Sequence, residues 1–415
     1  MSRYKPYPRY KESGIEWLGE VPEHWFIKRL GQYFEERREK VSDKDFAPLS
    51  VTKNGIVPQL ETAAKTDAGD NRKKVCVGDY VINSRSDRKG SSGLSELEGS
   101  VSLICTVLEP KHFHPRYTHH LFRSYPFQEE FYRYGKGIVA DLWSTNYSEM
   151  KNINIPIPDD IEQIIIANFL DRESAKIDTL IEKQQRLIDL LKEKRQAVIS
   201  HAVTKGIDPN VKMKESGVEW LGEVPEHWEI KKLKYNLRLQ TQKVTIDGHN
   251  VIALENIESK SGKYVPTESS YQGEDVKFKV GDILFGKLRP YLAKVYKCNS
   301  NGVAFGDLLT YRPVGPFDSS FAFYSLLSEA FIRIVDSSTY GAKMPRASSE
   351  FINEMLLATP LLPEQIAIAE HLDIQTAKID TLIAKARQAI ELMKERRIAL
   401  ISAAVTGKID VRELV

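Results

Sequence analysis

The chain has 415 residues, of which 41% are hydrophobic and 28% charged, and its formal net charge is +2. This composition is typical of a folded chain with more than one domain and excludes a disordered one. No apolar run reaches the roughly 18 residues that a membrane helix needs, and the start, MSRYKPYPRYKESG, has no signal-peptide core. We therefore expect a cytoplasmic protein without membrane contact. Cys76, Cys105 and Cys298 form no C-x-x-C pair, which argues against a disulfide framework and a zinc knuckle.

The chain contains an internal duplication. KESGIEWLGEVPEHW begins at residue 11, and KESGVEWLGEVPEHW begins 203 positions later, at residue 214. The same interval separates Val-Gly-Asp at 77–79 from Val-Gly-Asp at 280–282. A longer block with Glu162-Gln163 recurs 202 positions later with Glu364-Gln365. Because the period is about half the chain, it indicates two copies of one large module rather than a solenoid, whose repeats span roughly 20 to 50 residues.

Each copy begins with a β-rich domain, which we call head 1 (residues 1–157) and head 2 (residues 207–360). Both contain short runs rich in Val, Ile and Tyr, separated by Gly, Asn and Ser, as expected of strands joined by long loops. Outside the shared blocks the two heads agree poorly. A constant frame with a variable interior indicates that the heads perform one task on two different targets.

A long amphipathic helix follows each head, at residues 158–206 and 361–415. A helix of this length cannot bury its apolar stripe within one small domain, so we predict that the two helices pack as an antiparallel coiled coil with a pseudo-twofold axis. The fold class is therefore α+β. The alternative is that each helix packs only on its own head. The predicted seam consists of Ile177, Leu180, Leu187, Leu191, Val198, Ile379, Leu382, Ala389, Met393 and Leu400.

The ends of these helices carry recognisable signals. Asp160 is predicted to be the N-cap of the first helix, with Gln163 three residues later, and Pro363 is predicted at the first position of the second. Gly206 and Gly407 are predicted to close the two helices, because glycine readily adopts the left-handed conformation that ends a helix.

Two similar heads separated by a helical spacer suit a partner that presents two similar sites along an axis. Duplex DNA is such a partner, and dimeric DNA readers place their half-sites about one helical turn or its multiples apart. Because the interiors of the heads differ, the two half-sites are expected to differ in sequence, which a homodimer could not achieve.

The shared blocks resemble a known family. EWLGEVPEHW followed by a lysine-containing KRL or KKL, Val-Gly-Asp before a strand, and EQ-x-x-I-A leading to A-K-I-D-T-L-I and A-V-T-G-K-I-D are similar to the specificity subunit of prokaryotic type I restriction-modification enzymes. The resemblance covers nearly the whole chain, with heads 1 and 2 as target-recognition domains, and one departure is Ile161 where the second copy has Pro363.

The resemblance implies a DNA-binding subunit with no catalytic residues and no cofactor of its own. Such a subunit binds a split, asymmetric double-stranded DNA target and docks two adenine methyltransferase subunits, and a restriction translocase can join. S-adenosylmethionine and ATP are then expected on the partner subunits, where the methyltransferase flips the target adenine from the stack.

Arg, Lys, Ser and Asn on loops at strand ends are the side chains expected to contact DNA, since Arg or Lys to guanine and Asn or Gln to adenine discriminate bases. Any one of them could instead contact phosphate or be a solvated surface charge. The predicted DNA-binding residues are Ser84, Arg85, Arg88, Lys89, Lys136, Trp143 and Asn146 in head 1 and Lys287, Arg289, Lys294, Tyr340, Lys343 and Arg346 in head 2.

Other readings of the sequence are weaker. The histidines in HFHPRYTHH (112–120) have no cysteine or carboxylate at ligand spacing, so we predict no metal site. Trp17, Trp25, Trp220 and Trp228 are predicted to be core residues, with partner contact left open for exposed neighbours. The alternative to a DNA reader is a duplicated protein-binding scaffold with a coiled-coil spacer. Specific binding to one bipartite duplex would distinguish the two.

Overall fold

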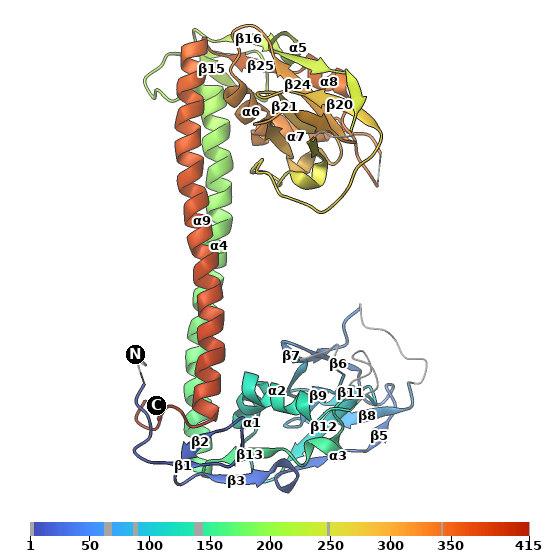
Figure 1. The fold of residues 1–415 in the computed structure, drawn as a ribbon, viewed down its shortest axis with the longest axis vertical. Helices are drawn as coiled ribbons and strands as arrows, with labels where there is room; N and C mark the ends of the chain where they lie inside the picture. Colours follow the sequence, from blue (N-terminus) through green and yellow to red (C-terminus); the bar gives the residue numbers. More distant parts are fainter. Residues whose placement is uncertain are drawn as a thin grey trace. The chain divides into compact units, whose positions relative to one another are not determined.

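The computed structural model describes residues 4–61, 69–85, 90–136, 144–246, 250–341 and 343–414. The chain divides into two compact units: Met1–Gln184 with Gln388–Val415, and Gln185–Arg387. The division cuts both long helices, α4 (Asp160–Lys205) and α9 (Leu362–Val405). Each unit therefore contains one head and one part of each long helix (Figure 1). Within the described residues, no helix combines the length and the low polarity needed to cross a bilayer.

Head 1 is built from short strands and three helices. A four-stranded sheet has the order β10-β9-β12-β4, a three-stranded sheet the order β11-β8-β5, and β1-β2, β13-β3 and β6-β7 are two-stranded. The helices of head 1 are α1 (Pro115–Arg123), α2 (Tyr125–Arg133) and α3 (Tyr147–Met150). Its strands are β1 (Tyr10–Glu12), β2 (Glu20–Pro22), β3 (Phe26–Arg29), β4 (Phe34–Glu36), β5 (Lys40–Val41), β6 (Leu49–Thr52), β7 (Gly55–Pro58), β8 (Arg72–Val75), β9 (Tyr80–Asn83), β10 (Ser92–Leu94), β11 (Gly99–Val101), β12 (Cys105–Pro110) and β13 (Asn154–Ile157).

Head 2 repeats this topology. Its four-stranded sheet β22-β21-β24-β17 matches β10-β9-β12-β4, and β23-β20-β18 matches β11-β8-β5. The helices of head 2 are α5 (Leu233–Asn236), α6 (Ser319–Leu327), α7 (Glu329–Ser337) and α8 (Ser349–Glu354). Its strands are β14 (Met213–Glu215), β15 (Glu223–Pro225), β16 (Glu229–Lys232), β17 (Leu237–Gln240), β18 (Lys243–Thr245), β19 (Val251–Ile252), β20 (Glu274–Phe278), β21 (Ile283–Gly286), β22 (Val295–Lys297), β23 (Gly302–Ala304), β24 (Leu308–Pro313) and β25 (Leu356–Thr359).

The two heads differ at the margins of this common topology. In head 2 the strand β19 runs parallel to β23, where head 1 has only the isolated parallel bridge between Pro48 and Ser100, and head 1 has the β6-β7 hairpin. The equal order of the matched strands explains how the duplicated frame tolerates divergent loops, because ladder hydrogen bonds join backbone groups that every residue but proline carries.

The long helices pack together in antiparallel fashion, as matched ion pairs show. In the first unit Arg397 of α9 pairs with Asp178 of α4, and in the second unit Arg195 of α4 lies 3.5 Å from Asp380 of α9. Arg195 and Arg397 are equivalent in the duplication, as are Asp178 and Asp380. Each Asp–Arg pair thus repeats with the helices exchanged, which is the pseudo-twofold relation that the sequence predicts.

The alternative, in which each helix packs only on its own head, is not what the structure has. The core of head 1 includes Leu400 and Val405 of α9 as well as Ile166 of α4, and the core of head 2 includes Ile199 of α4 and Ile368 of α9. Each head is therefore completed by both long helices.

The predicted seam is correct in part. Ile177, Leu191, Ile379 and Leu400 are buried, and Val198, Ala389 and Met393 are half-buried. Leu180, Leu187 and Leu382 are instead 49%, 43% and 50% exposed, while Ile188, Ile383 and Ile390 are buried.

The correction follows from helix geometry. At 3.6 residues per turn, a residue eleven positions after Ile177 lies only about 20° from it around the helix, whereas Leu180 lies about 60° away and Leu187 about 80°. Ile188 and Ile390 occupy the eleven-residue positions after Ile177 and Ile379, and both are buried. Positions chosen by a strict seven-residue repeat therefore drift around the helix, away from the stripe of residues that is buried.

The helix starts also differ from the prediction by one residue. The side chain of Asp159, not Asp160, accepts the backbone N–H of Glu162 at 2.8 Å, and α9 begins at Leu362, so that Pro363 is its second residue. Both helices nevertheless begin at equivalent positions, so the exchange of Ile161 for Pro363 does not shift the start. Gly206 and Gly407 follow the helices with φ of +75° and +72°, as predicted.

The Glu-Gln pair near the start of each helix holds the head. Gln163 donates to the carbonyl of Pro158 at 3.0 Å and accepts the N–H of His114 at 2.9 Å. In the second unit Gln365 donates to the carbonyl of Pro360 at 2.8 Å and accepts the N–H of Asp318, also at 2.8 Å. Both glutamines are 1% exposed. The same amide therefore joins the last strand of the head, the long helix and the start of α1 in head 1 or of α6 in head 2.

The neighbouring glutamate binds the repeated segment EHW. Glu162 accepts from His24 Nε2 and Trp25 Nε1, each at 2.9 Å, and Glu364 lies 2.8 Å from His227 Nε2. Trp25 and its counterpart Trp228 are fully buried. Trp17 and Trp220 are half-buried and meet the rings of Phe127 and Phe331 edge-on. The prediction that these tryptophans are structural is confirmed.

The end of α9 returns to head 1. In the second unit Gly206 follows α4 and lies against Trp228, and the chain runs directly on into head 2. In the first unit Gly407 follows α9 and lies against Pro22 and Trp25, and the backbone N–H of Asp410 donates to the carbonyl of Lys5. In the first unit, the segment after α9 thus contacts the segments around Lys5 and Trp25 noncovalently. In the second unit, the equivalent connection from α4 to the head is a continuous chain.

Gly407 and Gly206 offer a matched test of this contact. A Cβ on Gly407 would lie 2.3 Å from Pro22 Cδ, whereas a Cβ on Gly206 would have its nearest neighbour, on Trp228, at 3.4 Å. We expect Gly206→Ala to lower the free energy of unfolding by about 1 to 2 kcal/mol, the cost of a left-handed alanine. We expect Gly407→Ala to cost about 1 to 3 kcal/mol more through overpacking. Urea denaturation of both variants measures the difference, and equal losses would contradict the close contact.

Candidate nucleic-acid interface

The structure describes most of the predicted DNA-binding residues. Arg88, Lys89 and Trp143 lie outside the described residues. The remaining ones come from two segments in each head that are far apart in the sequence. These are 84–85 with 136 and 144–146 in head 1, and 287–294 with 340–341 and 343–346 in head 2.

In head 1 the two loops meet through backbone bridges. Ser144 forms isolated antiparallel bridges with both Arg85 and Lys136, and the N–H of Thr145 donates to the carbonyl of Ser84 at 3.2 Å. The first loop follows the buried strand β9, and the second follows α2, so these two elements set the position of the junction.

The predicted side chains of head 1 differ in accessibility. Ser84 is buried, and its hydroxyl lies 2.9 Å from that of Thr106, so it points into the head. Arg85 and Asn146 are exposed, and Asn146 precedes the short helix α3. Lys136 is exposed and lies 3.3 Å from a carboxylate oxygen of Glu149. Arg85, Lys136 and Asn146 are therefore the described side chains of this set that can reach a ligand.

Head 2 makes the same junction from its own two loops. Arg346 forms isolated antiparallel bridges with both Leu288 and Tyr340. The N–H of Ala347 donates to the carbonyl of Lys287 at 2.9 Å, and that of Arg289 to the carbonyl of Pro345 at 2.8 Å. Arg346 thus holds the place of Ser144, with Leu288 in place of Arg85 and Tyr340 in place of Lys136.

Charges gather at this junction in head 2. The guanidinium of Arg346 pairs with both carboxylate oxygens of Asp307, and Lys287 Nζ lies 3.7 Å from the same carboxylate. These hydrogen bonds to Arg346 hold the pKa of Asp307 below its usual range. Arg289 and Lys343 are exposed, as is Tyr340 at 65%.

Lys294 stands apart from this group. Its ammonium donates to the carbonyl of Leu254 at 2.6 Å, and burial lowers its pKa. It therefore stabilises the fold between β21 and the 254–256 turn in this structure, whereas the prediction placed it among the DNA-facing residues.

Sequence reasoning did not identify Asp307 or Ser144. Neither belongs to a motif, because each acquires its position from a contact with a distant loop.

The structure explains the Val-Gly-Asp blocks that recur in the sequence. Asp79 pairs with Arg37 from the end of β4, whereas Asp282 pairs with Arg312 from β24.

These two carboxylates are buried and also accept backbone N–H groups at their own turns, from Cys76 and Lys279. The aspartate is thus equivalent in both heads. The arginine follows β4 in head 1, whereas in head 2 it belongs to β24, which matches β12, the neighbour of β4. They are structural ion pairs.

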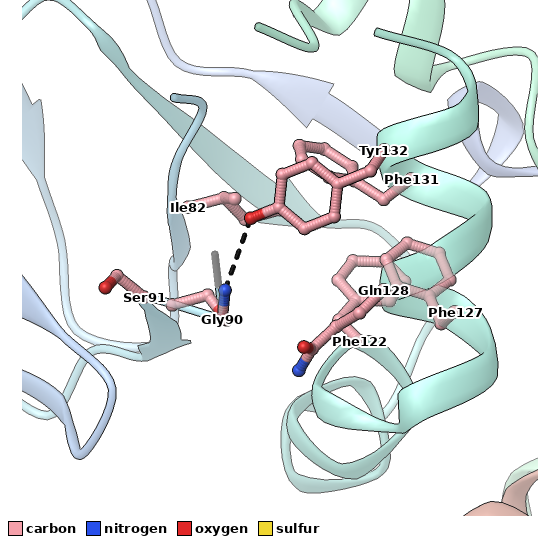
Figure 2. A pocket seen from close by; sticks show the side chains of 9 residues that line it. Ile82, Gly90, Ser91, Phe122, Phe127, Gln128, Phe131 and Tyr132 are labelled. Carbon is pink, nitrogen blue, oxygen red and sulfur yellow. Dashed lines mark hydrogen bonds between the residues drawn. The ribbon is translucent and has the colours of Figure 1, made fainter. Parts of the chain in front are cut away.

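A hollow in head 1 lies beside the first loop (Figure 2). The N–H of Gly90 donates to the hydroxyl of Tyr132 at 3.2 Å across it. With about 20 Å³ it has room for little more than one water molecule, so it is a packing gap and not a ligand site. Its lining consists of Ile82, Gly90, Ser91, Ser92, Phe122, Phe127, Gln128, Phe131 and Tyr132.

The histidine cluster of α1 serves packing. His120 Nε2 lies 2.7 Å from Asp171 of α4, the position that Asp373 holds beside Tyr324 in the second unit. His119 accepts the N–H of Leu94 in β10 at 3.4 Å, and burial lowers the pKa of His119 to about 4.

Two heads of one topology, completed by two shared helices and each with one loop junction, define a duplicated protein with two long antiparallel helices. Comparison with known proteins agrees. The type I restriction enzyme MjaVIII specificity subunit of Methanocaldococcus jannaschii is 25% identical over 438 residues, covering 98% of each chain. The type I restriction enzyme EcoDI specificity subunit of Escherichia coli is 23% identical over 283 residues, covering 63% of each. No family model matches the chain.

Solved structures share the fold. A chain from a type I restriction-modification system, solved for its complex assembly and conformational transition, superposes with a TM-score of 0.65 at 16% identity, covering 93% of this chain and 98% of that one. The HsdS subunit from Thermoanaerobacter tengcongensis gives a TM-score of 0.55 at 16% identity, covering 94% and 98%. The chain is thus related along nearly its whole length to type I restriction specificity subunits.

The burial of His119 predicts acid sensitivity of head 1. Because its folded-state pKa of about 4 lies below the ordinary value of 6.5, the unfolded chain binds a proton that the folded chain excludes between these two values. Stability is full above pH 6.5 and falls as the pH drops toward 4, by up to about 3 kcal/mol. His119→Asn keeps an acceptor for Leu94 and removes this titration. The acid loss in urea midpoint should be smaller in the variant than in wild type but not abolished, because burial also lowers the pKa of His120, to about 3. An unchanged acid loss would contradict this assignment.

Proposed function

We propose that this chain is the DNA-recognition subunit of a type I restriction-modification complex and binds a bipartite, asymmetric duplex, one half-site per head. The observation that carries the proposal is the loop junction. In both heads two distant loops are joined around one residue, Ser144 or Arg346, by the same pair of backbone bridges, and exposed cationic side chains surround it. The topology of the site is constant while its side chains differ, which suits two half-sites of different sequence.

The junctions supply both kinds of DNA contact. Exposed side chains such as Arg85, Lys136 and Lys343 suit phosphates, which position a protein on the duplex, or base edges, which carry the sequence information. The charge of the whole chain is only +2, so the attraction to DNA is local to these loops. In this proposal the chain acts in the cytoplasm and carries out no chemistry itself. Partner subunits supply S-adenosylmethionine and ATP, and a restriction subunit is an optional member.

The long helices offer matched surfaces for two methyltransferase subunits. Three pairs of equivalent apolar residues remain exposed: Ile164 and Ile366 at 43% and 41%, Leu180 and Leu382 at 49% and 50%, and Leu190 and Leu392 at 45% and 57%. Exposed apolar residues that recur in both copies suit two copies of one partner. The same feature favours the second candidate, a protein-binding scaffold for which DNA is incidental.

Methylation mapping tests the proposal. The full chain is co-expressed with the methyltransferase subunit of its system in a methylation-free host, and N6-methyladenine is mapped across the genome. We expect one split motif. Arg85→Ala should alter only the half-site read by head 1, because its exposed side chain lies at that junction. Methylated motifs identical in wild type and variant would make Arg85 at most a phosphate contact. A stable complex that leaves no methylated motif would favour the scaffold.

The exposed leucines test the docking. Combined replacement Leu180→Gln and Leu382→Gln should weaken binding of the methyltransferase subunit by about tenfold or more while leaving the melting temperature unchanged. Ile177→Gln with Ile379→Gln is the matched contrast, because these buried neighbours should lower the melting temperature first. Calorimetric titration with the methyltransferase measures the affinity. Unchanged affinity of the leucine variant would place docking elsewhere.

A further inference from the structure

Arg346 differs from Arg37 and Arg312, the two arginines that bind the aspartates of the Val-Gly-Asp blocks. Its Nε and Nη2 donate to the two oxygens of Asp307 at 3.1 and 3.0 Å. The side chains of Arg346 and Asp307 are 37% and 23% exposed, whereas Asp79 and Asp282, which bind Arg37 and Arg312 in the same manner, are 3% and 2% exposed. The Arg346 fork is therefore the accessible one of the three.

The carboxylate occupies only one edge of this guanidinium. Asp307 takes the edge formed by Nε and Nη2, and among the described residues nothing accepts from Nη1. The remaining edge, Nη1 with the second N–H of Nη2, has two parallel donors. This spacing matches the two acceptors of guanine in the major groove, N7 and O6, and the arginine pair to guanine is the commonest specific contact.

The surroundings suit a reading residue. Arg346 is the central residue of the junction, so its Cα is set by bridges to Leu288 and Tyr340. Arg289 and Ala293, at the two ends of the turn Pro290–Leu292, have φ of +50° and +47°. Non-glycine residues in this conformation are costly and cluster at functional sites. Lys287 Nζ, 3.7 Å from the Asp307 carboxylate, adds a second positive charge beside that carboxylate while the free edge of the guanidinium binds a ligand.

We propose that Arg346 reads a guanine in the half-site of head 2 and that Asp307 is its positioning residue. The inference rests on the proposed function and adds the base and the residue pair. Asp307 holds the guanidinium plane before DNA arrives, so less side-chain freedom is lost on binding than for an unrestrained arginine. Head 1 has Ser144 at the position of Arg346, so its half-site depends on other contacts.

Selection from a randomised duplex library tests the inference. The full chain in complex with its methyltransferase subunits is used as wild type, Arg346→Lys, Asp307→Asn and the control Arg333→Lys, an exposed arginine of α7 that belongs to neither loop of the junction. In Arg346→Lys, which retains the charge but not the fork, we expect one guanine of the second half-site to lose about tenfold or more of its preference, with the first half-site unchanged. Asp307→Asn should weaken the same guanine, and Arg333→Lys should match wild type.

The outcomes separate the two proposals. If wild type selects a bipartite motif and Arg346→Lys selects the same motif with the same preference for guanine, Arg346 is at most a phosphate contact and the inference fails. If Asp307→Asn alone is without effect on the guanine while its melting temperature is unchanged, the positioning role fails. If wild type selects no motif, the proposed function fails instead.

Discussion

The Glu-Gln pair at the start of each long helix, with its buried glutamine, is the contact on which the rest of the structure depends. One amide joins the last strand of the head, the long helix and the start of α1 or α6, and the adjacent carboxylate binds the EHW segment. An amide with no access to water must have its donors and acceptors satisfied, so it admits few arrangements of the three elements. This explains why EHW and EQ, more than 130 positions apart in each copy, recur together.

Contacts between segments that are distant in the sequence also account for the division of the chain into two compact units. Each unit draws on both long helices, so each head is completed by a helix that follows the other head in sequence. In the second unit the returning element is covalently continuous, whereas in the first unit the end of the chain supplies it through Gly407 and Asp410. Duplication followed by divergence of the heads then leaves the frame intact, because the frame contacts join the shared blocks to one another or to backbone groups.

The loop junctions, whose side chains the frame contacts do not constrain, are the parts that we propose recognise DNA. The backbone bridges around Ser144 and Arg346 place two loops side by side in each head, and backbone contacts tolerate any side chain that fits the space. The central residue can therefore change from serine to arginine without a change of fold. Arg346 with Asp307 is one result of this freedom, and the buried forks at Asp79 and Asp282 show the same chemistry used for stability.

Periodicity and repetition in the sequence determined the duplication, the β-rich heads, the paired antiparallel helices and the buried tryptophans, because each depends on patterns that recur locally or at a constant interval. Tertiary structure decided the rest. The helix seam passes through Ile188 and Ile390 and not through Leu187 and Leu382, because 3.6 residues per turn carry the stripe away from a strict heptad. The side chains of Ser84 and Lys294 are held by Thr106 and Leu254, and Asp307 lies at the junction because it binds Arg346. These partners are distant in the sequence, and no local sequence pattern records such contacts.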